Sequence, residues 1–378
     1  MIKVQNQIAV QFNIGGFTDF INAEDFKGFR VVELAGGLRP YIELSFDLKN
    51  PAIIPFLNSG NIITMMFGID TPESEVMQFE ICGDTKTKEF QVGSTVHLMG
   101  AMYNRKFTSQ IKSDEWIGKS YEVLGYLTAV DGLKFHSNVS KTNDKQTWYQ
   151  SGKTDWGMSK YIAQRAYRDS ETFFVYGFDN NNFYFFDMRE LLKRGPKWIL
   201  TVRGGGDENP ENPIVNIGTY FPDDTNAGTN ADLAGKNTTI VSYNLDTGEF
   251  TNPRYSLKTM TTMQTNKVNI NSTGCINYDY HITTGDEHPY SVEAQNQNFR
   301  NSVLYSSYTV HVPVTGQYRN FRLFDVVQLN PSDSDKEAEG IYFITGIARE
   351  YRDLQYSVML TLNRESANGI KGDLEGGS

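Results

Sequence analysis

The sequence predicts a mainly β fold with an α+β insertion, and three observations support this. The chain has 21 Tyr and 24 Phe beside 33 Gly and only 12 Pro, a composition typical of many short strands and turns. Strand-like segments gather at both ends of the sequence, and one helical pattern lies between them. A length of 378 residues leaves room for two or three domains. We therefore expect two strand-rich domains and a small helix-hairpin domain.

The first strand-rich domain is expected over residues 1–136. Polar and apolar side chains alternate in residues 41–48, which is the period of a strand with one buried face. Residues 62–67 form a nearly continuous apolar run, which indicates burial on both faces. The expected strands, which would form an antiparallel β-barrel, are 41–48, 62–69, 76–83, 95–107 and 120–126.

A small α+β domain is expected over residues 137–200. It opens with a polar linker, 137–152. From Asp155 or Ser159 onward, apolar residues recur at three- and four-residue steps, the pattern of an amphipathic helix with a cap in front of it. Two strands, 172–178 and 183–188, follow and are joined by a tight turn at 179–182.

Residues 201–290 are rich in Asn, Asp, Thr and Gly, and we expect a loop-rich region that partly completes the first barrel. Its apolar runs are 214–220, 239–245 and 268–270, and Asp246, Thr247 and Gly248 indicate a hairpin turn.

The second β-barrel domain is expected over residues 291–366. It starts with a helix at 291–306 and continues with four regularly spaced strands at 308–314, 321–329, 340–349 and 354–363. Residues 367–378 are rich in Gly, Asp and Ser, and we expect a flexible tail.

Charge and cysteine content exclude several classes of protein. The net charge of -10 would repel a polyanion, so tight DNA binding is disfavoured. Cys82 and Cys275 lie far apart, which excludes a disulfide framework and any CxxC site. Residues 1–16 are too polar for a signal peptide, and the longest apolar run, 62–69, is too short to span a bilayer. We expect a soluble protein made in the cytoplasm, without a membrane partner.

Three motifs that could indicate a ligand site fail on their details. Gly204–Gly206 lacks the following GK[ST] of a phosphate loop and precedes Asp207 and Glu208, so a flexible loop is expected. An acidic run at 333–339 lacks the mid-loop Gly and closing Glu of a calcium loop, and we expect a solvated hairpin tip. No HxH or HExxH pair joins the five histidines, His97, His136, His281, His288 and His311.

Other candidates for catalysis are equally weak. Two carboxyl groups could form a glycosidase pair, whose separation the sequence does not give; the candidates are Glu33, Asp84, Asp179 and Asp187. Cys82 is expected to be an inert buried thiol, since no base accompanies it. The aromatic residues between 173 and 186 are better explained by core packing than by a platform for sugars or bases. We expect no catalytic, cofactor-binding or metal-binding residues and no cofactor.

The order of segments resembles the central baseplate hub proteins of contractile-tailed phages, a family that includes the hub part of type VI secretion spike proteins. Three stretches carry the resemblance. The first is the apolar run at 53–68 with 79–83, and the second is the helix from Trp156 with the hairpin ending at Asp187. The third, the most specific, comprises 308–314, Arg322–Leu329, Gly340–Ile347 and 356–364. Phe324 and Asp325 stand where many members have Pro-Gly, so we expect a wider turn.

This resemblance implies a homotrimer with two tail-tube-like barrels in each subunit. Such a ring adapts the hexameric tail tube protein above to a trimeric central spike protein below, contacts other baseplate proteins, and forms part of a conduit that DNA passes without specific binding. The location implied is the virion tail baseplate, and no catalysis is implied. The alternative is a secreted or surface β-sandwich protein, either carbohydrate-binding or a hydrolase, which would use the aromatic hairpin and the loops.

Overall fold

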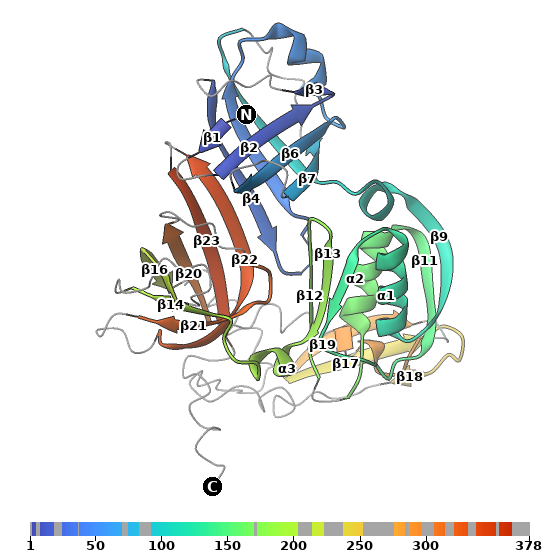
Figure 1. Ribbon diagram of the computed structural model, residues 1–378. Helices are drawn as coiled ribbons and strands as arrows, with labels where there is room; N and C mark the ends of the chain where they lie inside the picture. Colours follow the sequence, from blue (N-terminus) through green and yellow to red (C-terminus); the bar gives the residue numbers. More distant parts are fainter. Residues whose placement is uncertain are drawn as a thin grey trace.

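A sheet of 15 strands runs through the molecule, and a helix-containing unit lies beside its lower half (Figure 1). The computed structural model describes residues 2–4, 8–18, 25–36, 38–69, 75–82, 92–169, 172–202, 214–222, 237–251, 276–283, 287–292, 294–295, 306–313, 321–331, 338–352 and 355–364. The predicted mainly β fold with helical elements is confirmed.

The upper half of the sheet has the strand order β1-β2-β6-β7-β8-β5-β4, and every pair in it is antiparallel. A short 3-10 helix, Pro51–Phe56, lies between β5 and β6. Side chains alternate along β8, with Val96, Leu98 and Met102 buried in the core. The strands are β1 (Ile2–Val4), β2 (Ile8–Ile14), β3 (Phe17–Thr18), β4 (Phe26–Leu34), β5 (Tyr41–Asp47), β6 (Ile62–Ile69), β7 (Glu75–Cys82) and β8 (Thr95–Met102).

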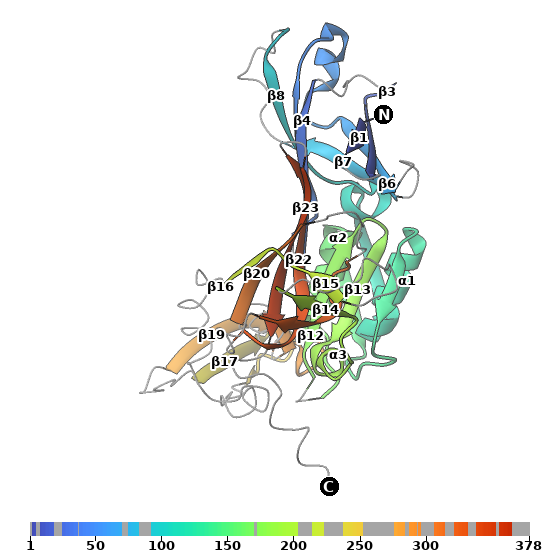
Figure 2. The same cartoon turned by 60° about the vertical axis from the view of Figure 1, so that its left-hand side comes forward.

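The lower half of the sheet contains the strands from the end of the chain. They are β14 (Trp198–Thr201), β15 (Ile214–Asn216), β16 (Thr219–Pro222), β20 (Ser306–Pro313), β21 (Val326–Asn330), β22 (Gly340–Arg352) and β23 (Gln355–Arg364). The 13-residue β22 joins the two halves, because it pairs with β21, β23 and β4. Figure 2 shows β22 and β23 rising toward the upper half beside β4.

Two expectations for the chain between the halves need correction. Residues 201–290 were expected to add to the first barrel, but β15 pairs with β14 and β16 with β20, both in the lower half. Strand patterns indicate that a segment is extended, but not which strand it pairs with. The second predicted strand of the second domain, 321–329, starts late, since β21 begins at Val326 after a turn.

The helix-containing unit consists of a two-stranded ribbon, two helices and a three-stranded sheet. Figure 1 shows α1 and α2 between the β9–β11 ribbon and the strands β12 and β13, which form a three-stranded sheet with β10 in the order β10-β13-β12. The unit comprises a π-helical turn (Arg105–Ser109), β9 (Ile111–Gly118), α1 (Ser120–Val130), β10 (Lys134–Ser137), β11 (Gln146–Thr154), α2 (Asp155–Arg165), β12 (Phe174–Asp179), β13 (Asn182–Asp187) and α3 (Met188–Leu192).

The predicted helix and hairpin of this unit are confirmed as α2, β12 and β13, but its first half was predicted wrongly. Residues 120–126 were expected to be a strand and instead start α1, whose buried Val123, Leu124 and Leu127 recur at helical spacing. The polar linker contains β11, which is polar because one face of the ribbon is exposed. β9 and β10, expected in the first domain, pair with β11 and β13.

A separate three-stranded sheet contains β17 (Asn237–Asn244), β18 (Phe250–Thr251) and β19 (Ile276–Thr283). The hairpin turn predicted at Asp246–Gly248 is confirmed between β17 and β18, with Gly248 at a φ of 70°. The apolar run 268–270 and the acidic run 333–337 lie outside the described residues, as does most of the helix expected at 291–306. No helix in the described ranges is long and apolar enough to cross a membrane.

Candidate functional site at the junction of the three parts

The two halves of the sheet and the helix-containing unit meet directly after β4. Ala35 pairs with Gly177 of β12 in an isolated antiparallel bridge. The Ala35 backbone N–H donates to the Thr345 carbonyl of β22 at 2.7 Å, and the Gly36 N–H donates to the Tyr176 carbonyl of β12 at 2.7 Å. Two consecutive residues therefore connect β4 to both neighbouring parts. We call this region the junction.

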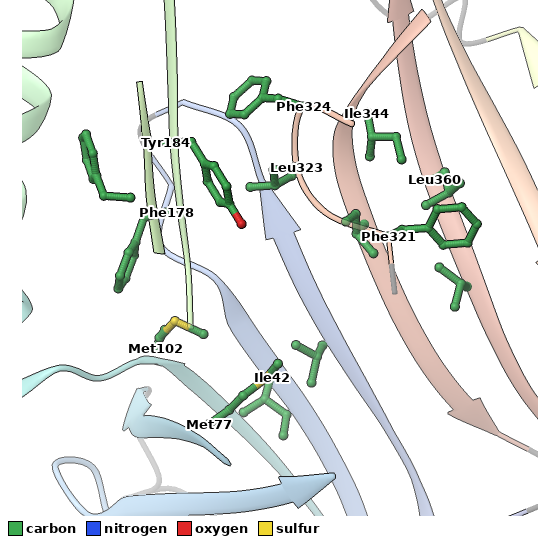
Figure 3. Close-up of a cluster of buried hydrophobic side chains, with 14 of the residues drawn as sticks. Ile42, Met77, Met102, Phe178, Tyr184, Phe321, Leu323, Phe324, Ile344 and Leu360 are labelled. Atoms are coloured by element: carbon green, nitrogen blue, oxygen red, sulfur yellow. The ribbon is translucent and has the colours of Figure 1, made fainter. Parts of the chain in front are cut away.

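The turn before β21 projects into the junction. Phe324 is 3% exposed, and its ring meets those of Tyr184 and Phe186 edge-on, with centroids 6.0 Å and 5.6 Å away. Figure 3 shows Phe324 and Leu323 pointing from this turn toward the strands that carry Tyr184 and Phe178. A Cβ added to Gly177 would lie 3.1 Å from the Phe324 ring and 3.3 Å from Leu323, so the close approach favours glycine there.

Phe324 also has an unusual backbone. Its φ is 66°, and no other non-glycine residue in the described ranges has a positive φ. The wider turn expected at this point is not observed, because the Asp325 N–H donates to the Arg322 carbonyl at 3.1 Å and closes a four-residue turn. Phe324 occupies the third position, where glycine is usual. The packing of its ring offsets the cost of the left-handed conformation.

A buried ion pair lies beneath this turn. Arg349 of β22 pairs through Nη1 with the Glu33 carboxylate of β4, and their side chains are only 6% and 4% exposed. Nη2 of Arg349 donates to the Phe321 carbonyl at 2.9 Å. The guanidinium therefore links both halves of the sheet to the turn that carries Phe324. Removing either partner would leave an unpaired charge in the core.

Asp179 of β12 adds a second carboxyl group to the junction. It accepts hydrogen bonds from the Tyr184 hydroxyl and from Nδ2 of Asn182, both at 2.6 Å. Burial, and next the Glu33 carboxylate, raise the pKa of Asp179 to about 7, although both hydrogen bonds and Arg349 oppose the shift. Burial and the Asp179 charge also raise the pKa of Tyr184 above its usual range.

The structure places three of the four carboxyl groups considered for catalysis. Glu33 and Asp179 come together at the junction, but they are 3% and 7% exposed and engaged with protein partners. Asp187 forms an ion pair with Arg168 at 3.2 Å, and Asp84 lies outside the described residues. A glycosidase needs both groups to face a substrate, and the buried pair does not.

The structure also places several of the other candidates. Cys82 is exposed and not buried as expected, because alternation along β7 places Ile81 inward and the thiol outward. His97 contacts Ser45 at 2.8 Å, and His136 contacts Asn182 at 2.9 Å. Within the described ranges, no group of three or more His, Cys, Asp and Glu could hold a metal ion. Gly204–Gly206 and Cys275 lie outside those ranges.

Core packing of the aromatic hairpin is confirmed. All eight of its aromatic residues are at most 9% exposed; they are Phe173, Phe174, Tyr176, Phe178, Phe183, Tyr184, Phe185 and Phe186. Arg349 and the role of Phe324 were not predicted from the sequence. The available signal for Arg349 was a charged residue at the end of the mostly apolar stretch 340–349. The signal for Phe324 was that Phe-Asp stands where many members of the resembled family have Pro-Gly.

The fold as a whole is similar to that of solved phage tail proteins. The 43 kDa tail protein of prophage MuSo2 from Shewanella oneidensis aligns with a TM-score of 0.55 and 8% identity, over 95% of this chain and 99% of that one. The tail protein from Neisseria meningitidis MC58 aligns with a TM-score of 0.52 and 10% identity, over 95% and 96%.

A weaker match is an E. coli component of the type VI secretion system, with a TM-score of 0.49, 11% identity and coverage of 93% and 76%. No protein-family model matches the chain, and no curated protein matches it in sequence. The predicted resemblance to phage tail proteins is confirmed at the level of the fold.

Proposed function

We propose that this protein is a structural component of a phage-type tail, namely the central hub of its baseplate. The observation that carries the proposal is the shared fold, which extends over 95% of this chain and 99% of the prophage tail protein. Because the similarity extends over nearly all of this chain, it supports a role that involves the helix-containing unit and both halves of the sheet.

The junction supports a mechanical role. Glu33, Arg349, Asp179 and Phe324 are buried, and together they fasten three parts of the chain to one another. A chain joined in this way transmits force as one body, because packed cores resist gradual deformation. Reactive chemistry gains no support from these groups, since their polar atoms are engaged within the protein.

The finer proposal is a homotrimeric ring in which each subunit contributes two tail-tube-like β-barrels. Six similar barrels would then match a hexameric tail tube on one side, while three subunits match a trimeric spike on the other. The net charge of -10 suits a conduit, because DNA passes an acidic wall without forming lasting phosphate contacts. The virion tail baseplate is the corresponding location.

A surface suited to a protein partner lies on the outer face of the β9–β11 ribbon. Ile111, Ile117 and Tyr149 are 73%, 70% and 47% exposed, and alternation along both strands places them on the face away from the helices. Ile117 and Tyr149 are diagonal neighbours across the ribbon, and neighbouring exposed apolar side chains are typical of interaction surfaces. The aromatic hairpin, on which a carbohydrate-binding function would depend, is buried instead.

The oligomeric state in solution tests the proposal. Mass photometry should be performed on the full chain over a concentration series, alone and with a candidate trimeric spike protein from the same source. We expect trimers, either alone or once the spike is added. A monomer or a two-fold dimer that persists with the spike present would contradict the hub function.

A further inference from the structure

A second buried acidic pair lies inside the helix-containing unit, apart from the junction. Asp131 follows the last residue of α1, and Asp155 is the first residue of α2. Their side chains are 0% and 1% exposed. Lys112 of β9 is the cation beside both, because it forms an ion pair with Asp155 and its Nζ lies 4.0 Å from Oδ1 of Asp131.

The two carboxyl groups are not equally satisfied. Asp155 receives hydrogen bonds from Lys112 and from Nε2 of Gln150, the latter at 2.7 Å. Neither oxygen of Asp131 has a hydrogen-bond partner among the described residues. A buried ionised carboxylate without donors is costly. Two facing carboxylates are both acceptors, so they can bond to each other only through a proton.

We propose that Asp131 and Asp155 share one proton, and that this proton fastens the β9–β11 ribbon to the two helices. Four elements meet at the pair: β9 through Lys112, β11 through Gln150, α1 through Asp131 and α2 through Asp155. When the proton leaves, two negative charges compete for the single Lys112 ammonium. The contact that fixes β9 to α2 then weakens, and the ribbon opens more often.

The charges around Asp131 and Asp155 set the pH at which the shared proton leaves. Burial, and next the neighbouring Asp155, raise the pKa of Asp131 to about 7, whereas Lys112 and Lys106 lower it. The pKa of Lys112 is raised: burial lowers it, but the carboxylates of Asp155, Asp131 and Asp114, the last on its own strand, raise it. Because the folded-state pKa lies above the ordinary value of 3.8, the folded state holds the extra proton between these values. The stabilisation is complete at low pH and is lost as pH rises toward 7.

Hydrogen exchange of the full chain tests the proposal. In the wild type, we expect protection of the β9 and β11 amides, corrected for intrinsic exchange, to fall at least fivefold between pH 6 and pH 8. Asp131→Asn should remove this loss, because the amide keeps the shape and donates an N–H to Asp155 at every pH. Glu115→Gln, on the exposed face of β9, is the matched control and should behave as the wild type.

Two results would overturn the proposal: protection in the wild type that does not change with pH, or a loss that persists in Asp131→Asn. If Asp131→Asn does not fold, Lys112→Met decides the question. Removing the cation that favours the ionised form should move the midpoint of ribbon opening to higher pH, and an unchanged midpoint would refute the shared proton.

Discussion

Phe324 combines an unfavourable backbone with favourable packing. The left-handed conformation costs a non-glycine residue about 1 kcal/mol. The buried ring offsets this cost through its contacts with Tyr184 and Phe186. The Phe324 ring, which a glycine would not provide, packs the lower half of the sheet against the helix-containing unit.

The free-energy cost of the left-handed backbone at Phe324 can be measured separately from the contribution of its ring. Phe324→Ala loses the ring and keeps the strain, so we expect a loss of about 3–5 kcal/mol in stability. Phe324→Gly loses the same ring and relieves the strain, and it should be more stable than the alanine variant by about 1 kcal/mol. Urea denaturation of both variants checks the order. If Phe324→Ala were as stable as Phe324→Gly, or more stable, the backbone would not be strained.

Asp179 gives the junction a pH dependence. Its pKa of about 7 lies above the ordinary value of 3.8, so the folded state binds more protons and stability falls as pH rises between these values. Asp179→Asn should reduce the loss between pH 5 and pH 8 by on the order of 2 kcal/mol. Denaturation midpoints across that range provide the measurement, with Asp246→Asn in an exposed turn as control. An unchanged slope in Asp179→Asn would contradict the assignment.

Among the elements, α2 shows what local sequence can predict. Its apolar spacing and its cap lie within a dozen residues, and Oγ1 of Thr154 accepts the Gly157 N–H at 3.1 Å. α1 was missed because Tyr121, Val123 and Tyr126 are residue types common in strands. Only the burial of Val123, Leu124 and Leu127 on one face distinguishes the two.

The cap of α2 should have a measurable effect. Thr154→Ala removes the only side-chain acceptor at the start of the helix within the described ranges, and we expect a loss of about 1 kcal/mol. Thr154→Ser keeps the hydroxyl and should remain within a few tenths of the wild type. Thermal unfolding of the two variants compares them directly. Equal losses in both would mean that the methyl group, and not the cap, matters.

The junction could not be predicted from local patterns, because its members are distant in sequence. Glu33 and Arg349 are 316 positions apart, and each looks like an ordinary charged residue within a strand. The sequence brought Glu33 and Asp179 under consideration as carboxylates but did not indicate that they meet. Tertiary pairing of β4 with β22 and of β12 with the chain after β4 creates the site.

At the scale of the whole molecule, the ribbon surface predicts how the protein binds its neighbours. Ile117→Lys with Tyr149→Lys places charge on the exposed apolar face without touching the core. We expect unchanged thermal stability and at least a tenfold loss of incorporation into tails, because a buried interface does not tolerate unpaired charge. Complementation of a deletion mutant measures incorporation. Thr247→Lys, in the exposed turn between β17 and β18 and outside the ribbon, is the control. Equal incorporation of all variants would exclude this surface.

The central claim is that three copies of this chain form a ring between tube and spike. An electron-microscopy average of the purified assembly, viewed along its symmetry axis, tests it most directly. We expect three-fold symmetry with six similar lobes around an open channel, two from each subunit. An average with two-fold symmetry, or a single compact particle without a channel in the presence of the spike, would contradict it.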